Sequence, residues 1–275
     1  MIDIIIPVYN AQNYLFCALS SINNQTIKNK VSVIIVDDHS TQDYSDIINH
    51  YKDINIKYIY LKKNRGPGVA RNVGIKHSSN PYIVFLDADD LFYDNNVLEE
   101  MINLIENSSC LIGKELLYNK TGIQFGNLHG KLYLRKIIEQ NKIKFPSLYY
   151  GEDTIFNILY ILKIPENKIK ITNKIFYKWQ KVNKNSLSYQ KIKISNFWTL
   201  FKLSEKSFNK TSNELFKQIY LGYLLNSVYQ VLEKDYNKKY LHKIKQFCDN
   251  YVDDIKEIQK VHKLKICELF EEKYE

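Results

Sequence analysis

Cysteine is scarce in this chain, and its placement excludes two common kinds of site. The sequence of 275 residues holds four cysteines, widely separated, with no C-x-x-C pair and no cysteine and histidine cluster at zinc-ligand spacing. Scattered cysteines are typical of reduced thiols rather than of a disulfide framework. The cysteines therefore predict a protein of a reducing compartment.

Long apolar runs are absent as well. No stretch approaches the roughly 20 apolar residues that a membrane-spanning helix needs. The chain begins with a strand-like segment and lacks the basic and apolar regions of a signal peptide. We therefore expect a cytoplasmic protein, and a peripheral association with the inner face of the membrane stays open.

The composition predicts a substantial core and an anionic partner. Hydrophobic residues make up 45% of the chain and aromatic residues 13%, and the length suits one α/β domain with a smaller extension. The formal net charge of +9 favours nucleotide phosphates, acidic glycans, phospholipid headgroups or nucleic acid as partners.

The most informative stretch is residues 81–91, an apolar run that ends in carboxylates. Residues 82–86 are β-branched, aromatic or aliphatic without a break, which predicts a short buried strand. Asp87, Asp89 and Asp90 follow at once, and ligands of open α/β sheets collect at the carboxyl ends of strands. Like charges this close repel one another unless a cation neutralises them. This stretch therefore predicts a Mg²⁺ or Mn²⁺ site.

Other readings of these aspartates can be checked in the sequence. A turn followed by a helix cap also favours Asp. An EF-hand loop that starts at Asp87 would need Gly and Glu where the chain has Phe92 and Leu98, which excludes it. A haloacid-dehalogenase-like phosphatase carries a similar D-x-D, but on its first strand, whereas here two strand–helix units come before it.

Strands and helices alternate over the first part of the chain. The pattern predicts strands at 2–9, 31–36, 57–61 and 82–86, and helices at 11–25, 44–51, 69–77 and 96–105. Such alternation indicates a mostly parallel sheet that is covered on both faces. Further on we expect a strand at 110–118, a helix from 129 to about 141, a helix at 155–162 and an extended segment at 169–179.

From residue 192 the pattern is helical, with no proline and only Gly222. We place a boundary near 190, with one domain at 1–190 and a helical extension at 191–275. Aromatic residues of the extension could bury one face and leave a stripe for an acceptor, a membrane surface or a homo-oligomer formed through these helices.

Two other segments carry local signals. The glycines of N-R-G-P-G-V-A-R-N at 64–72 allow close approach of a ligand to free amides at a helix start, yet the third glycine of a dinucleotide fingerprint is missing. Asp153 begins a predicted helix, where an acidic side chain is commonly a partner of the helix dipole.

The segments PVYN, VDDHS, NRGPGVARN, FLDADD, KLY and GEDT occur in this order, and the set resembles the family 2 glycosyltransferases, inverting nucleotide-sugar enzymes of the GT-A fold. The resemblance covers residues 1–190 and leaves the C-terminal helices outside. It implies an α/β GT-A fold, a Rossmann-like and mostly parallel sheet flanked by helices, with a C-terminal helical extension.

The resemblance also implies a nucleotide site. Tyr9 would stack on or flank the base, and Asp37 or Asp38 would accept the imide N–H of a uracil, which favours a UDP-sugar. Arg71 would neutralise the diphosphate or close over the base. The same motifs place three further residues at the nucleotide, namely Pro7, Asn72 and Ala88.

The resemblance implies a metal site at the FLDADD motif and a catalytic residue in the GEDT motif. Asp87 would hold the ribose and the metal, and Asp89 would bind the Mn²⁺ or Mg²⁺ that bridges the phosphates. Asp153 would be the general base that takes the proton from the acceptor hydroxyl. Glu152 would orient the loop or the acceptor.

The chain departs from the family pattern in two places. His39 stands where Gly is common, and Lys184 and Asn185 stand where Arg is frequent in the closing segment.

The sequence therefore predicts a metal-dependent inverting glycosyltransferase that moves a sugar from a UDP-sugar to a glycan or other hydroxyl acceptor in cell-surface glycan synthesis. Glycosylation of a protein or of a modified nucleic-acid base, and a catalytically idle GT-A binding module, stay open as alternatives.

Overall fold

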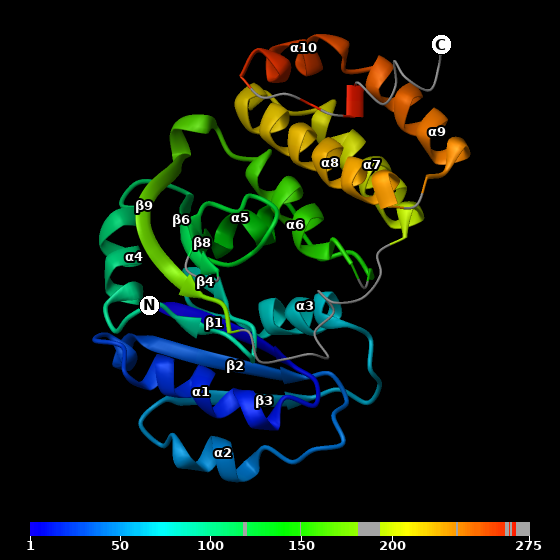
Figure 1. Ribbon diagram of the computed structural model, residues 1–275. Helices are drawn as coiled ribbons and strands as arrows, with labels where there is room; N and C mark the ends of the chain where they lie inside the picture. The colour runs from blue at the N-terminus through cyan, green and yellow to red at the C-terminus, as the bar shows by residue number, and fades with distance from the viewer. Residues whose placement is uncertain are drawn as a thin grey trace.

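A computed structural model of the chain describes residues 1–117, 120–148, 150–180, 193–234, 236–261, 264 and 266–267. The described strands form one mixed sheet in the order β3-β2-β1-β4-β8-β6-β9-β5, and β7 pairs with β6 (Figure 1). The strands are β1 (Ile2–Val8), β2 (Val31–Asp37), β3 (Asn55–Tyr60), β4 (Tyr82–Phe85), β5 (Leu91–Phe92), β6 (Cys110–Leu117), β7 (Lys120–Gly122), β8 (Lys131–Leu134) and β9 (Ile169–Lys178).

Helices cover both faces of this sheet. The helices are α1 (Gln12–Asn23), α2 (Ser45–His50), α3 (Pro67–His77), α4 (Val97–Ile105), α5 (Arg135–Gln140), α6 (Glu152–Ile161), α7 (Ile194–Phe208), α8 (Glu214–Lys234), α9 (Lys238–Asp249) and α10 (Val252–Val261). Buried residues of α1 and α4 and partly buried residues of α2 pack on one face, and buried residues of α3, α5 and α6 pack on the other. The predicted fold class, an α/β sheet flanked by helices with a helical C-terminal part, is confirmed.

The first strand shows why this sheet is buried on both sides. Ile4 and Ile6 point to the core that contains α1, whereas Ile5 points to the core that contains α3, because side chains alternate along a strand. A Cβ added to Gly74 of α3 would lie 2.4 Å from Cγ2 of Ile5. The absence of a side chain at this position lets α3 lie directly on β1.

The strand directions create the edge at which a site can form. β1 runs parallel to β2 and β4, and β6 runs parallel to β9. β8 is antiparallel to both β4 and β6, so β6 and β9 run in the same direction as β4. The carboxyl ends of β1, β2, β4 and β9 therefore meet at one edge of the sheet.

One element differs in kind from the sequence prediction. Residues 131–134 were predicted to lie in a helix that begins at 129, but they form β8, and the helix α5 begins only at Arg135. Tyr133 pairs with Ile83 of β4 on one side and with Cys110 of β6 on the other. The backbone groups of β4 and β6 that face each other need hydrogen-bond partners, and β8 supplies them. This long-range pairing outweighs the local helical pattern.

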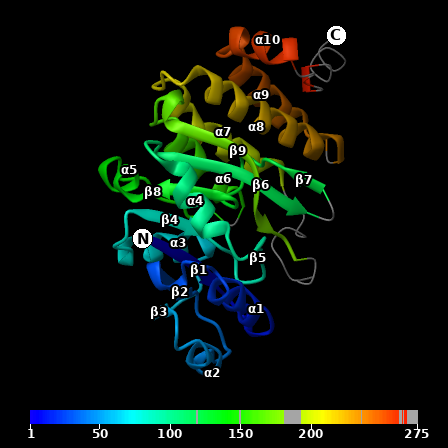
Figure 2. The ribbon, with the colours of Figure 1, turned by 90° about the vertical axis from the view of Figure 1, so that its left-hand side faces the viewer.

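The C-terminal helices pack on the sheet domain through α6. α7 contacts α6, and α8 and α9 in turn contact α7. Both views place α7 to α10 at the end of the molecule away from α1 and α2 (Figures 1 and 2). One continuous apolar cluster joins Phe85 of the sheet to Phe201 of α7. The predicted boundary near 190 lies outside the described residues.

None of the described helices combines the length and the apolar character that crossing a membrane requires.

Candidate active site

A single buried arginine joins two parts of the chain that are far apart in sequence. Nη2 of Arg71 donates to Oδ1 of Asp87 at 2.8 Å. Nη1 donates to Oε1 of Glu152 at 3.0 Å and to Oδ1 of Asp153 at 2.8 Å. The Arg71 side chain is only 4% exposed. The guanidinium therefore connects the end of β4 to the start of α6.

Local backbone geometry presents these groups to one another. Gly66 and Pro67 begin α3, and Arg71 follows one turn later. At the start of α6, Gly151 has a φ of 76°, in the left-handed region that favours glycine. The chain then turns into α6, so that Glu152 and Asp153 lie in its first turn. Acidic side chains are favoured there by the helix dipole.

The three carboxylates around Arg71 differ in exposure and in pKa. Glu152 is 8% exposed, whereas Asp153 is 23% and Asp87 27% exposed. Burial raises the pKa of both Glu152 and Asp153, and Arg71 opposes that rise. Burial would also raise the pKa of Asp87, but Arg71 and His129 outweigh it and hold that pKa well below its usual range. Asp87 is therefore a fixed anion, and Asp153 is the accessible carboxyl group of the acidic pair.

A histidine that the sequence prediction did not include holds the other side of Asp87. Nε2 of His129 lies 3.1 Å from Oδ2 of Asp87. The ring stacks on Tyr177 with centroids 4.1 Å apart and meets Trp179 edge-on at 4.9 Å. Burial alone would lower the pKa of His129, but the nearby carboxylates, Asp87 first, raise it to about 9. His129 is thus protonated at neutral pH and donates to Asp87.

Further residues complete the surroundings of His129. Nε1 of Trp179 donates to Oε2 of Glu115 at 2.7 Å, and the same oxygen lies 3.9 Å from Nδ1 of His129. Tyr177 and Trp179 come from the end of β9, which reaches the same sheet edge as β4. The aromatic end of the predicted segment at 169–179 was the signal that could have indicated their place.

Asp90 and His129 supply candidate metal ligands beside Asp87. Asp87, Asp90 and His129 each offer one potential ligand atom, and these three atoms all lie within 4.8 Å of one another. Asp90 accepts hydrogen bonds from Tyr177 Oη at 2.7 Å and from the backbone N of Gln180 at 2.8 Å. Burial raises the pKa of Asp90 to about 7.

This donor set fits a divalent cation, because a cation would stabilise the ionised form of a buried carboxyl group. The two carboxylates suit Mg²⁺ or Mn²⁺, and His129 would become a third ligand only as a neutral imidazole, after losing its proton and its hydrogen bond to Asp87. Asp89, the metal ligand of the sequence prediction, is half-buried in the same turn. Its role as a metal ligand stays a prediction.

The residues predicted to bind the base lie at the ends of β1 and β2. Asp38 accepts backbone N–H groups from Arg65 at 2.9 Å and from Gly66 at 2.6 Å. Asp37 accepts from the backbone N of Ser40 at 2.7 Å and from Tyr58 Oη at 2.5 Å. Both carboxylates hold neighbouring loops in place, and their contact with a base stays a prediction.

The other predicted nucleotide residues differ in their surroundings. Tyr9 is 53% exposed and so presents an accessible ring, whereas Ala88 is buried. Pro7 lies in β1, opposite Val36 of β2. The Asn72 amide donates to the backbone O of Phe145 and accepts from its backbone N, each at 2.9 Å. Asn72 therefore fixes the loop that leads to α6.

The first departure from the family pattern has a conformational reason. His39 has a φ of 71°, in the left-handed region where Gly carries no penalty. Its Nδ1 lies 2.9 Å from Tyr60 Oη and 3.2 Å from the backbone O of Leu61. Lys184 and Asn185, the second departure, lie outside the described residues.

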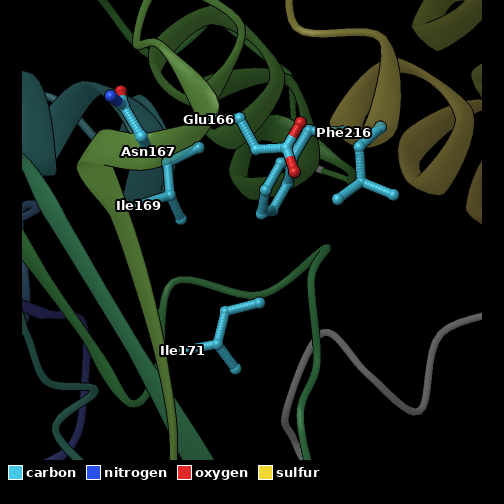
Figure 3. A pocket seen from close by; sticks show the side chains of 6 residues that line it. Glu166, Asn167, Ile169, Ile171 and Phe216 are labelled. Atoms are coloured by element: carbon cyan, nitrogen blue, oxygen red, sulfur yellow. The ribbon is translucent and has the colours of Figure 1, made fainter.

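A separate hollow lies at the opposite edge of the sheet. It has a volume of about 340 Å³ and lies between the start of β9 and the start of α8 (Figure 3). Its lining residues are Glu166, Asn167, Ile169, Ile171, Leu215 and Phe216. Because β9 runs parallel to β4, its start lies away from Asp87, so this hollow is not part of the candidate active site.

Comparison with known proteins identifies the family. Residues 3–154, more than half of the chain, match the family described as Glycosyl transferase family 2. The chain belongs to this family. An uncharacterized glycosyltransferase of Haemophilus influenzae is 31% identical over 254 residues, which cover 86% of this chain and 96% of that relative. The predicted family is therefore confirmed.

A further relative and a solved structure extend the comparison. The poly(ribitol-phosphate) beta-N-acetylglucosaminyltransferase TarP of Staphylococcus aureus is 28% identical over 247 residues, which cover 80% of this chain and 72% of TarP. The crystal structure of S. aureus TarS 1-349 in complex with UDP-GlcNAc superposes on this chain with a TM-score of 0.77 at 22% identity. The match covers 90% of this chain and 80% of the TarS chain. The chain spans only about a fifth of several longer relatives, for example 22% of an uncharacterized glycosyltransferase of Rickettsia bellii.

Proposed function

We propose that this chain is a metal-dependent inverting glycosyltransferase that moves a sugar from a UDP-sugar to an acceptor hydroxyl in the synthesis of a cell-surface glycan. The observation that carries the proposal is the pair of 2.8 Å contacts by which Arg71 joins Asp87 at the end of β4 to Asp153 at the start of α6. This junction brings the expected donor side and the expected acceptor side of one reaction together.

The donor assignment rests on the comparisons. TarS, whose fold this chain shares, is described in complex with UDP-GlcNAc. TarP is by its name a poly(ribitol-phosphate) beta-N-acetylglucosaminyltransferase. These findings support UDP as the nucleotide and a polyol or sugar hydroxyl as the acceptor.

In the proposed reaction Asp153 is the general base. Its carboxylate takes the proton of the acceptor hydroxyl as that oxygen attacks the anomeric carbon of the donor. The bond from the anomeric carbon to the diphosphate oxygen breaks, UDP leaves, and the anomeric centre is inverted. Asp153 suits this role better than Glu152 because it is the more exposed of the two, 23% against 8%.

The other residues position these groups. Arg71 holds the Asp153 carboxylate through Oδ1. His129 holds Asp87 from the opposite side of the same carboxylate. A divalent cation bound by Asp87 with Asp89 or Asp90 would act as a Lewis acid toward the diphosphate.

Replacement of the base tests the proposal. Asp153→Asn should lower the rate of transfer by roughly 10²–10⁴-fold, because a sugar hydroxyl is a poor nucleophile without a base. UDP affinity, measured by calorimetry with Mn²⁺, should change only a few-fold. UDP-glucose and UDP-N-acetylglucosamine serve as donors, with free UDP as the measured product.

A matched control is Asp46→Asn, since Asp46 is an exposed aspartate in the first turn of α2. The control should leave both transfer and UDP binding unchanged. Near-native transfer by Asp153→Asn, or loss of UDP binding together with transfer, would contradict the assignment of Asp153 as the base.

A further inference from the structure

A cavity beside the start of α6 has no role in the site described so far. Its volume is about 290 Å³, at the lower end of the roughly 300–1,000 Å³ of small-molecule sites. One side comes from the loop before α6 and the other from the first turns of α7. The lining residues are Ser147, Leu148, Tyr150, Ser195, Asn196 and Thr199.

The cavity is held next to the proposed base by the packing of α7 on α6. A Cβ added to Gly151 would lie 2.6 Å from Cδ1 of Leu200, so α7 lies against the residue that precedes Glu152 and Asp153. Thr199 lines the cavity and is the neighbour of Leu200, and Tyr150 is the neighbour of Gly151. The cavity therefore adjoins the start of α6, while the predicted base-binding residues lie at the ends of β1 and β2.

Of the five polar side chains of the lining, only that of Thr199 forms a hydrogen bond with another described residue, donating to the backbone O of Ser195 at 3.2 Å. Among the residues that the structure describes, no hydrogen bond involves the side chains of Ser147, Tyr150, Ser195 or Asn196. Ser195 and Thr199 are four residues apart on α7 and so lie on the same face of the helix. Hydroxyl and amide groups of this kind both donate and accept hydrogen bonds.

The lining also offers an aromatic ring that is fixed in place. Tyr150 is half-buried, and its ring meets that of Phe197 edge-on at 5.7 Å. Burial, with Tyr223 and Glu152 nearby, raises the pKa of Tyr150 to about 12, so its hydroxyl keeps its proton and can donate. An apolar ring face with several uncharged hydrogen-bonding groups matches a ligand that carries both C–H and O–H groups.

We propose that this cavity is a subsite for a neutral, hydroxyl-rich acceptor, a sugar or a polyol, which it holds beside Asp153. The six lining side chains that the structure describes are all uncharged, which favours a neutral ligand over an anion. The proposal rests on the proposed function for the direction of transfer, but binding in the cavity needs neither donor nor turnover. It can therefore be tested by itself.

The test is saturation-transfer difference NMR on the full chain without nucleotide. The probes are the methyl glycosides of glucose, galactose and N-acetylglucosamine, and free ribitol. At least one probe should bind wild type, and Asn196→Leu, which keeps the shape of the side chain but removes its amide, should weaken that probe at least five-fold. Tyr150→Ala should weaken it as strongly by removing the ring.

The matched control is Asn49→Leu on α2, an exposed asparagine on a helix that packs on the other face of the sheet. It should bind the probe as wild type does, and circular dichroism confirms that each variant is folded. If no probe binds wild type, or if Asn196→Leu and Tyr150→Ala both bind as wild type does, the subsite is not in this cavity. Failure of donor turnover in the Asp153 experiment would instead contradict the proposed function and leave this binding result standing.

Discussion

Replacing Arg71 by Met tests whether the guanidinium is what holds the strand end and the helix start together. Methionine keeps the length and the apolar stem of the side chain and removes the charge. Three carboxylates, those of Asp87, Glu152 and Asp153, would then lose their shared hydrogen-bond donor. Removing one partner from a buried ionic cluster typically costs roughly 3–5 kcal/mol, because the remaining charges are left unpaired in a poorly solvated site.

The loss of stability should depend on pH in a defined direction. In wild type the pKa of Asp87 is held below its usual range, so Asp87 contributes stability at neutral pH that is lost as the pH falls. Without Arg71 only His129 still stabilises the Asp87 carboxylate, so this contribution shrinks. The pKa values of Glu152 and Asp153 rise further, which makes their ionised forms more costly as the pH rises. The loss at Asp87 has its full size at any pH above about 4, where an unfolded aspartate is ionised. The change at Glu152 and Asp153 makes the difference between variant and wild type grow as the pH rises past their wild-type pKa values, which for Glu152 is about 8.

Urea unfolding of both proteins at about pH 9 and about pH 6 measures this difference, on either side of the raised pKa of Glu152. The control is Lys174→Met, because Lys174 forms an exposed ion pair with Glu100 at 2.8 Å and its removal should leave the free energy of unfolding nearly unchanged. Arg71→Lys should be intermediate, since one ammonium group cannot reproduce the planar fork that reaches three carboxylates. A loss below about 1 kcal/mol for Arg71→Met, or an equal loss at both pH values, would refute the reasoning.

Three further outcomes are expected. Because burial raises the pKa of Asp153, the rate of transfer should rise with pH over a range higher than that in which an exposed aspartate titrates. Arg71→Met should move this rise to still higher pH. A pH–rate profile that does not move would contradict the electrostatic coupling of Arg71 to Asp153. Asp89→Asn should abolish the Mn²⁺-dependent part of UDP binding in calorimetry, and unchanged binding would remove Asp89 from the metal site. Gly151→Ala should lower the free energy of unfolding by more than about 1 kcal/mol, because the φ of Gly151 is 76° and the new Cβ would lie 2.6 Å from Leu200. An unchanged thermal midpoint would show that the contact between the start of α6 and α7 can relax.

Much of the first part of the fold is readable in the sequence because it depends on local pattern. The strands at 2–8, 31–37, 55–60 and 82–85 and the helices between them lie within two residues of the predicted bounds. Short β-branched runs predict buried strands, and periodic apolar residues predict the helices that cover them. The ordered motifs likewise identified the family, and the carboxylates after 82–86 indicated the edge of the sheet where the candidate site lies.

Elements that depend on partners distant in sequence were not readable in this way. Residues 131–134 have a pattern compatible with a helix, and only their insertion between β4 and β6 makes them a strand. His129, directly before that strand, is brought to Asp87 by the same insertion. The contact of His129 with Asp87 could therefore be predicted only once the strand order was known.

The sequence by itself determined which chemical groups are present and that Asp87, Asp89 and Asp153 lie at element ends. The tertiary structure alone decided that Arg71 meets Asp87 and Asp153 at once, since 82 residues separate Arg71 from Asp153. It also decided that α7, outside the stretch that resembles the family, packs on Gly151 and lines a cavity beside the proposed base. Local periodicity reports which face of an element is apolar, but only the order of the strands and the packing of whole helices determine which faces meet.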